Sequence, residues 1–168
     1  MKRSILSTVL AACLIAGCGS SSYIPPTKLP KAFTYNIAGT QEELMSKTVA
    51  VMKSLDFEMA TEDPGNGTLK TAAKDIRVMP EECDCGTLYK KPLLTDPATT
   101  VKIVMEIYVQ NGSIKFLSFF TATHKSRTGA VDRVAECIST GVYEKQLVDL
   151  IIKRQALPGT DSPANPEQ

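Results

Sequence analysis

The most regular pattern in the chain is an alternation of apolar and polar residues on both sides of Asn111-Gly112. Alternation with a period of two is typical of a β-strand that buries one face, and Asn-Gly is a preferred pair for a two-residue type I′ turn. The sequence therefore predicts a long β-hairpin. Its turn sets the register and places four pairs on a core face: Val109–Ile114, Ile107–Phe116, Met105–Ser118 and Ile103–Phe120.

The other face of this hairpin is more apolar than contact with water requires. Val104, Leu117 and Phe119 fall on it and cluster around Tyr108. Either other strands or a loop cover this group, or it is a binding site of the kind that exposed apolar patches mark. We name these four residues the outer-face cluster and treat them as candidates for contact with a partner protein.

Two helices are predicted from apolar residues that recur every three or four positions. The first begins at Thr40-Gln41-Glu42-Glu43, a capping box in which a threonine hydroxyl and a glutamate carboxylate each satisfy a backbone N–H. It extends to about Leu55. The second follows Ser139-Thr140-Gly141 and extends to about Gln155, with cations in its last turn, where they suit the helix dipole.

The remaining segments complete an α+β domain over residues 31–156. Residues 32–38 alternate as a short strand and are a candidate edge of the sheet, and residues 57–61 and 68–73 flank a Pro- and Gly-containing turn, as in a hairpin. Residues 75–99 have no clear period and predict a long loop, and the polar residues 125–136 predict a loop or loose helical turn. We therefore expect an antiparallel sheet of about four to five strands with two helices packed on one face.

Composition argues against nucleic-acid binding and against catalysis. The chain has 19 basic and 18 acidic residues, so its overall charge predicts no basic footprint for nucleic acid or anionic lipid. It contains no G-x-S-x-G, H-E-x-x-H, P-loop or G-x-G-x-x-G motif. Its one histidine, His124, is expected to be an ordinary polar residue at a strand end. The sequence predicts a non-enzymatic domain with no cofactor.

The amino terminus indicates export. Lys2 and Arg3 precede an apolar run that is too short to span a bilayer permanently, the layout of a secretory signal. The segment Ile15-Ala16-Gly17-Cys18 resembles the lipobox of bacterial lipoproteins. That resemblance implies cleavage before Cys18, which would then carry a diacylglycerol thioether and an amide-linked acyl chain. Residues 1–17 would be the signal peptide, and residues 18–30, rich in Ser and Pro, a lipidated tether that reaches about 35 Å if extended.

The position after the lipidated cysteine also carries information in this family. In Gram-negative lipoproteins an aspartate there tends to retain the protein at the inner membrane, and this chain has Gly19 instead. The resemblance therefore implies an outer-membrane anchor facing the periplasm. At the other end, residues 157–168 contain three prolines and nothing to bury, and they predict a disordered tail.

Three cysteines remain after cleavage and acylation: Cys83, Cys85 and Cys137. An exported protein can form a disulfide, which would leave one thiol over. Alternatively, the three thiols and His124 would make a soft site for Zn²⁺ or Cu(I) if the fold gathered them. The spacing lacks a C-x-x-C pair, so we expect no metal.

The order of elements resembles small envelope lipoproteins with a helix-on-sheet domain, distantly like the helix-grip domains of the lipoprotein in the outer-membrane β-barrel assembly machine. The residues that carry the resemblance are Asp84-Cys85-Gly86 and Cys137-x-Ser139-Thr140-Gly141. It implies a disulfide between Cys85 and Cys137. Because cysteines two apart in an extended segment point the same way, Cys83 remains an alternative.

Together these observations predict a membrane-anchored lipoprotein whose periplasmic domain binds an envelope protein in assembly or maintenance of the envelope. The alternative is a periplasmic binding module for a small apolar ligand or a metal ion, held between the sheet and a helix.

Overall fold

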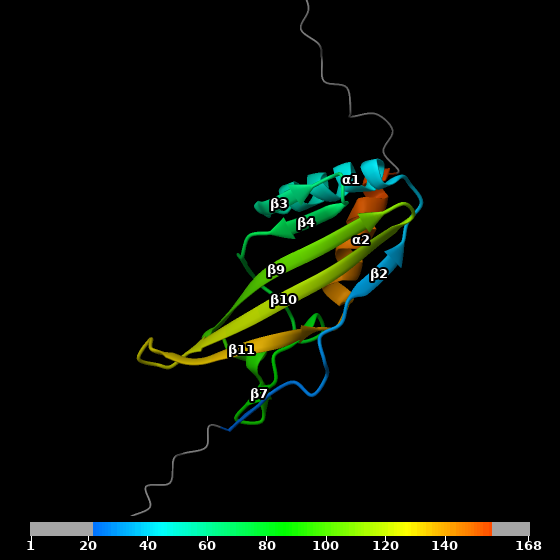
Figure 1. The fold of residues 1–168 in the computed structure, drawn as a ribbon. Helices are drawn as coiled ribbons and strands as arrows, with labels where there is room; N and C mark the ends of the chain where they lie inside the picture. Colours follow the sequence, from blue (N-terminus) through cyan, green and yellow to red (C-terminus); the bar gives the residue numbers. More distant parts are fainter. Residues whose placement is uncertain (1–21, 156–168) are drawn as a thin grey trace, which may run out of the picture.

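The computed structural model describes residues 22–155. Helices α1 (Gln41–Ser54) and α2 (Val142–Gln155) pack against each other and cover one face of an antiparallel sheet (Figure 1). The α+β class and the two helices are as predicted. The predicted signal peptide, Cys18 and the predicted disordered tail 157–168 lie outside the described residues.

The sheet has eight strands, so the prediction of four to five was too low. Six strands follow the order β3-β4-β9-β10-β11-β6, and β2 and β5 pair with β10 and β9. The number rises because β5, β6 and β11 were not predicted. β5 lies end to end with β4 beside β9, and β11 lies end to end with β2 beside β10 and pairs in turn with β6. The strands are β2 (Phe33–Asn36), β3 (Met59–Asp63), β4 (Thr68–Thr71), β5 (Lys74–Ile76), β6 (Cys83–Asp84), β9 (Thr99–Gln110), β10 (Ser113–Lys125) and β11 (Val131–Ser139).

The β9–β10 hairpin has the predicted register, and all four predicted cross-strand pairs are confirmed. Its apolar core-face residues are buried among apolar residues of both helices, including Leu44 and Met52 of α1 and Leu147 and Ile151 of α2. The capping box of α1 is also confirmed. The Thr40 side chain accepts a hydrogen bond from the Glu43 N–H, and the Glu43 carboxylate accepts one from the Thr40 N–H.

Two segments differ from the prediction. Residues 131–139 form β11 rather than a loop or loose helical turn. The period was hidden because Val134 lies on the open face and is 59% exposed, whereas Ala135 and Cys137 face the core. Residues 75–99 are not one loop, since they contain the end of β5, the strands β6, β7 (Thr87–Leu88) and β8 (Lys91–Pro92), and the 3₁₀ helix η1 (Leu93–Thr95). These strands are too short to give a periodic signal.

The segment expected to be a tether is attached to the domain from residue 22 onward. Tyr23–Ile24 forms strand β1, which pairs with β7 in a small second sheet of order β1-β7-β8. Figure 1 shows this small sheet at one end of the molecule, while the carboxyl end of α2 lies at the other. The described chain therefore enters and leaves the domain at opposite ends.

Candidate functional site

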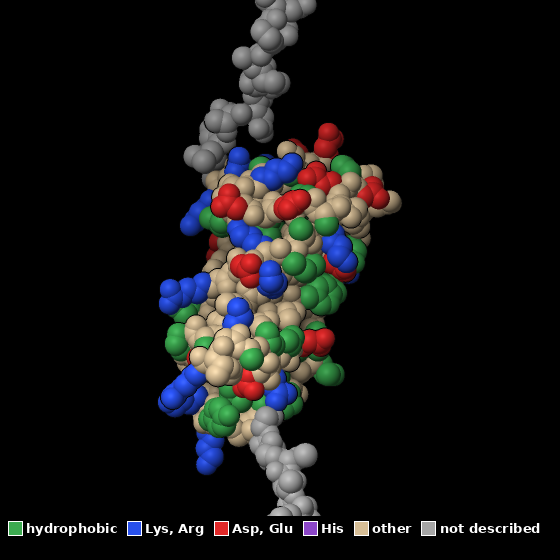
Figure 2. Space-filling model, turned by 90° about the vertical axis from the view of Figure 1, so that its left-hand side faces the viewer, with side chains coloured by type: hydrophobic (Ala, Val, Ile, Leu, Met, Phe, Trp, Pro, Cys, Tyr) green, Lys and Arg blue, Asp and Glu red, His purple; other side chains and the backbone are tan. Residues whose placement is uncertain are grey.

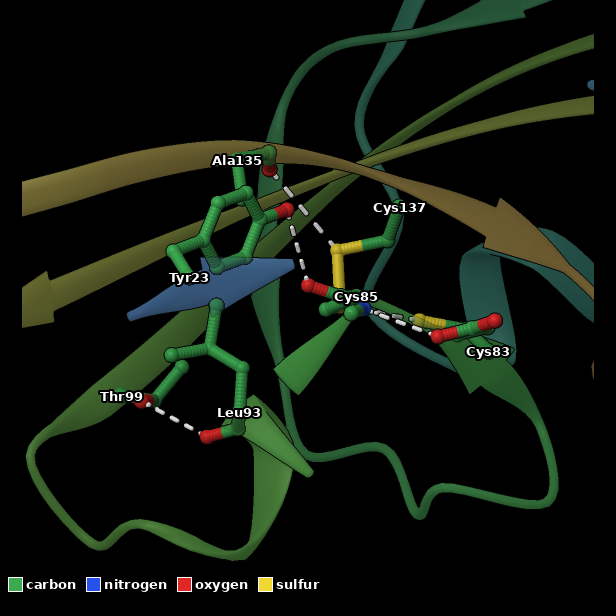
Figure 3. The surroundings of a disulfide bond; sticks show 9 residues. Tyr23, Cys83, Cys85, Leu93, Thr99, Ala135 and Cys137 are labelled. Atoms are coloured by element: carbon green, nitrogen blue, oxygen red, sulfur yellow. Dashed lines mark hydrogen bonds between the residues drawn. A yellow bond between two sulfur atoms is a disulfide. The ribbon is translucent and has the colours of Figure 1, made fainter. Parts of the chain in front are cut away.

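The three cysteines that follow Cys18 meet beneath the small sheet (Figure 3). Strand β6 runs antiparallel to β11 with Cys83 opposite Ser139 and Asp84 opposite Ile138, which places Cys85 level with Cys137. The structure joins Cys85 to Cys137 by a disulfide that closes a separation of 52 residues. This is the pair that the resemblance to envelope lipoproteins implied.

Cys83 is buried beside that disulfide. Its Sγ lies 3.5 Å from the Sγ of Cys85, and the three sulfur atoms lie within 4.8 Å of one another. Of the four residues of the alternative metal site, the fold thus gathers three, and His124 lies elsewhere, at the far end of β10. Because the disulfide occupies two of the sulfur atoms, one thiol is left as a ligand, and the set suits a cross-link better than a metal ion.

The amino-terminal strand packs against the disulfide segment. The Tyr23 hydroxyl donates to the Cys85 carbonyl at 3.1 Å, and the Arg133 guanidinium lies over the Tyr23 ring. Gly86 has a φ of +76°, and a Cβ there would lie 2.2 Å from the Ile24 carbonyl oxygen. Since only glycine permits this approach of two backbones, Gly86 lets the Asp84-Cys85-Gly86 segment pack directly against β1.

Burial decides the chemistry of Cys83. Loss of water around the thiol raises its pKa from the ordinary 9.0 to about 12, and the nearby Asp84 carboxylate acts in the same direction. The thiolate is the nucleophilic form, so Cys83 is a poor nucleophile in the folded protein. The geometry brings three sulfur atoms together, and the electrostatics keep the third one unreactive.

We predict that iodoacetamide leaves Cys83 unlabelled in the native protein at about pH 8 and labels it after unfolding in urea. The raised pKa also has a consequence for stability. Below pH 9 the thiol is neutral in both states, and from pH 9 toward 12 only the unfolded state ionises, so the contribution of Cys83 to stability is lost over that window. Labelling is measured from the intact mass before and after denaturation, and an iodoacetamide adduct on Cys83 of the native protein would contradict the labelling prediction.

One buried polar group, Glu144, was not predicted from the sequence. Glu144 is fully buried in the first turn of α2, where the Ser139 hydroxyl donates to its Oε2 at 2.8 Å. Ser139 also accepts a hydrogen bond from the Gly141 N–H. These contacts hold the start of α2 against the end of β11. The sequence signal was present, since Ser139 to Glu144 opens the predicted helix, but nothing local indicated that the carboxylate is buried.

His124 is not the ordinary strand-end residue that was predicted, because it is only 7% exposed. Its Nε2 lies 3.4 Å from Asp96 Oδ2, and its Nδ1 lies 3.4 Å from Asp132 Oδ2. The Nδ1 contact lacks the geometry of a hydrogen bond. Asp96 precedes β10 in the sequence and Asp132 follows it, so only the fold could bring both aspartates to one histidine.

The outer-face cluster lies on the side of the sheet opposite the helices, and no described helix or strand crosses it in Figure 1. Phe119 stands directly opposite Val104, and it is 46% exposed. Val104 and Leu117 are partly buried. Tyr108 differs from these three residues because it makes polar contacts. The Lys115 ammonium lies 4.5 Å from the centre of the Tyr108 ring, and the Tyr108 hydroxyl donates to the Glu106 carboxylate. The cluster is thus an apolar strip with a polar border.

A second surface feature lies between α1 and the turn of the β3–β4 hairpin. It is an open groove of about 770 Å³, within the range of small-molecule sites. Met45, Val49, Ala50 and Pro64 give it apolar walls, and the Lys53–Glu62 ion pair lies at its edge. The alternative prediction placed a ligand between the sheet and a helix, and this groove lies between α1 and the β3–β4 turn.

The described chain is therefore a two-layer α+β domain with a cysteine cross-link, an open sheet face and a groove beside α1. None of its described helices has the length and apolar character needed to cross a bilayer. No protein-family model matches the chain, and no curated protein matches it.

Among solved structures, the chain is similar to the crystal structure of a DUF4468 family protein from Bacteroides ovatus ATCC 8483. The TM-score is 0.38 at 10% sequence identity, over 75% of this chain and 79% of that chain. A similarity of this size carries no argument about function.

Proposed function

We propose that this protein is a lipoprotein anchored through Cys18 to the outer membrane, whose non-enzymatic periplasmic domain binds an envelope protein through the outer-face cluster. Two independent features support the proposal. The segment Ile15-Ala16-Gly17-Cys18 resembles a lipobox, and an internal disulfide is compatible with an oxidising compartment outside the cytoplasm.

The observation that carries the binding role is the exposure of Phe119. Phe119 leaves nearly half of its surface in water beside Val104 and Leu117, so its burial contributes little to the stability of the fold. Aromatic residues of this kind, on a firm surface with a polar border, are typical of the centres of protein interfaces. The long strands β9 and β10 supply the firm surface, and Lys115 and Glu106 supply the border.

We predict that Phe119→Ser abolishes capture of the partner while lowering the free energy of unfolding by only about 1 kcal/mol, because half of the side chain already contacts water. Capture is measured by cross-linking in intact cells followed by mass spectrometry. Ile152→Ser is the matched control, since Ile152 is 43% exposed on α2. Unchanged capture by Phe119→Ser, or a loss of about 3 kcal/mol or more, would show that the cluster serves packing instead.

The groove beside α1 favours a second candidate, a binding module for a small apolar ligand. Native mass spectrometry of protein purified from cells separates the two functions. A bound organic molecule that Ala50→Glu displaces, in protein that captures no envelope protein, would favour the ligand over the partner.

A further inference from the structure

The point at which the described chain begins is held firmly. The Ser22 carbonyl accepts a hydrogen bond from the Tyr89 N–H at 3.3 Å, and Tyr23 and Ile24 pair with Leu88 and Thr87. The Tyr23 side chain is held as well, by the Cys85 carbonyl and by the Arg133 guanidinium. The chain is therefore attached to the turn between β7 and β8 as soon as it enters the domain.

This attachment limits how far the domain can stand from the membrane. Cys18 precedes Ser22 by four residues. Four residues span at most about 14 Å however they are arranged, less than half the reach of about 35 Å calculated for an unattached tether to residue 30. An acylated Cys18 would therefore place the β7–β8 turn close to the headgroups of the bilayer.

The turn itself has an unusual backbone. Tyr89 and Lys90 form the two-residue loop between Leu88 and Lys91, and both have positive φ, 52° and 65°. Two-residue hairpin loops with positive φ at both positions usually contain Asn, Asp or Gly. A bulky residue there is uncommon and costs stability. Because Tyr89 is 70% exposed, the fold does not recover that cost by burying the ring.

Basic residues surround the same turn. Lys90 belongs to it and Lys91 follows it at the start of β8, and Tyr89 lines one hollow with Lys91 and another with Lys125 and Arg127. The overall charge of the chain did not predict this local group, because its members come from two separate segments. The acidic groups in these hollows are Asp96 and Asp132, and each of them faces a ring nitrogen of His124. Figure 2 shows Lys and Arg side chains around hydrophobic ones at the lower end of the molecule. We name Tyr89, Lys90, Lys91, Lys125 and Arg127 the basic tip.

We infer that the basic tip lies against anionic phospholipid headgroups of the membrane that carries the anchor. This inference rests on the proposed acylation of Cys18. Tyrosine is favoured at the membrane–water interface, and each lysine or arginine near an anionic bilayer strengthens binding about fivefold. Contact at this end directs α1 and the β3–β4 hairpin, with the groove between them, away from the membrane, and leaves the outer-face cluster on the side of the molecule.

The test uses the mature chain from residue 18 to 168 with Cys18→Ser, so that no acyl chain contributes to binding. Co-sedimentation is measured at low ionic strength with vesicles of phosphatidylcholine and phosphatidylglycerol in equal parts, and with phosphatidylcholine alone. We expect binding to the anionic vesicles only. Lys90→Gln with Lys91→Gln should weaken it about twenty-fivefold, from two charges at about fivefold each. Tyr89→Gly should weaken binding while relieving the turn.

The matched control is Lys153→Gln with Arg154→Gln, the same change of charge at the exposed carboxyl end of α2. Its binding should equal that of the parent protein. The inference is overturned if the parent protein does not distinguish the two kinds of vesicle, or if both double variants lose binding equally. Neither result depends on acylation, which is measured separately from the mass of the amino-terminal peptide.

Discussion

Reduction of the Cys85–Cys137 disulfide is expected to lower the free energy of unfolding by about 4 kcal/mol, because the cross-link closes a loop of 52 residues in the unfolded chain. A domain of this size has a net stability of about 5–15 kcal/mol, so the reduced protein should be close to unfolding at physiological temperature. Urea unfolding of the oxidised and the reduced protein gives the difference directly.

Cys83→Ala is the matched control for this experiment. It removes the neighbouring sulfur but leaves the cross-link, so reduction should cost the variant as much as it costs the parent protein. Peptide mapping of the non-reduced protein, alkylated in urea, should yield a linked peptide with Cys85 and Cys137, with Cys83 alkylated. Alkylated Cys137 in that map, or a Cys83→Ala protein that reduction no longer destabilises, would contradict the assignment of the bridge.

Replacement of Cys18 by serine is expected to move the protein from the membrane fraction to the soluble fraction or to leave the precursor uncleaved. Burial of acyl chains contributes about 0.8 kcal/mol per CH₂ group, so that one chain holds a protein marginally and three hold it effectively permanently. Fractionation of cells and the mass of the amino-terminal peptide are the measurements.

The control is Cys13→Ser, because Cys13 lies inside the proposed signal peptide and would be removed with it. That variant should remain in the membrane fraction with an acylated Cys18. Wild-type protein with a free, unacylated amino terminus in the soluble fraction would refute the anchor. The inference about the basic tip would then lose its basis, whatever its affinity for anionic vesicles.

The proposed contacts at the two surfaces are compatible. The basic tip and the outer-face cluster lie at different places in the fold. The tip is at the β7–β8 turn, the start of β8, the end of β10 and the loop after it, whereas the cluster is at Val104 and Tyr108 of β9 and Leu117 and Phe119 of β10. A domain held at its tip would keep the cluster accessible from the side. Phe119→Ser and Lys90→Gln with Lys91→Gln should accordingly affect partner capture and vesicle binding independently.

The sequence by itself determined the elements whose signal is local. The alternation around Asn111-Gly112 specified β9, β10 and their register, because a slip of one residue would turn every apolar side chain to the wrong face. The capping box from Thr40 to Glu43 specified the start of α1, since both of its hydrogen bonds join residues of one turn. The class of the domain followed from these elements alone.

Only the tertiary structure decided the features that depend on partners far away in the chain. Strands of two or three residues such as β1, β6 and β7 exist because an already formed neighbour pairs with them, and so short a segment has no period of its own. The same reason explains the aspartates on either side of His124, the burial of Glu144 and the bond from Tyr89 to Ser22. Pairing of strands, and packing of other segments against the sheet, create these contacts, and local sequence preference cannot indicate them.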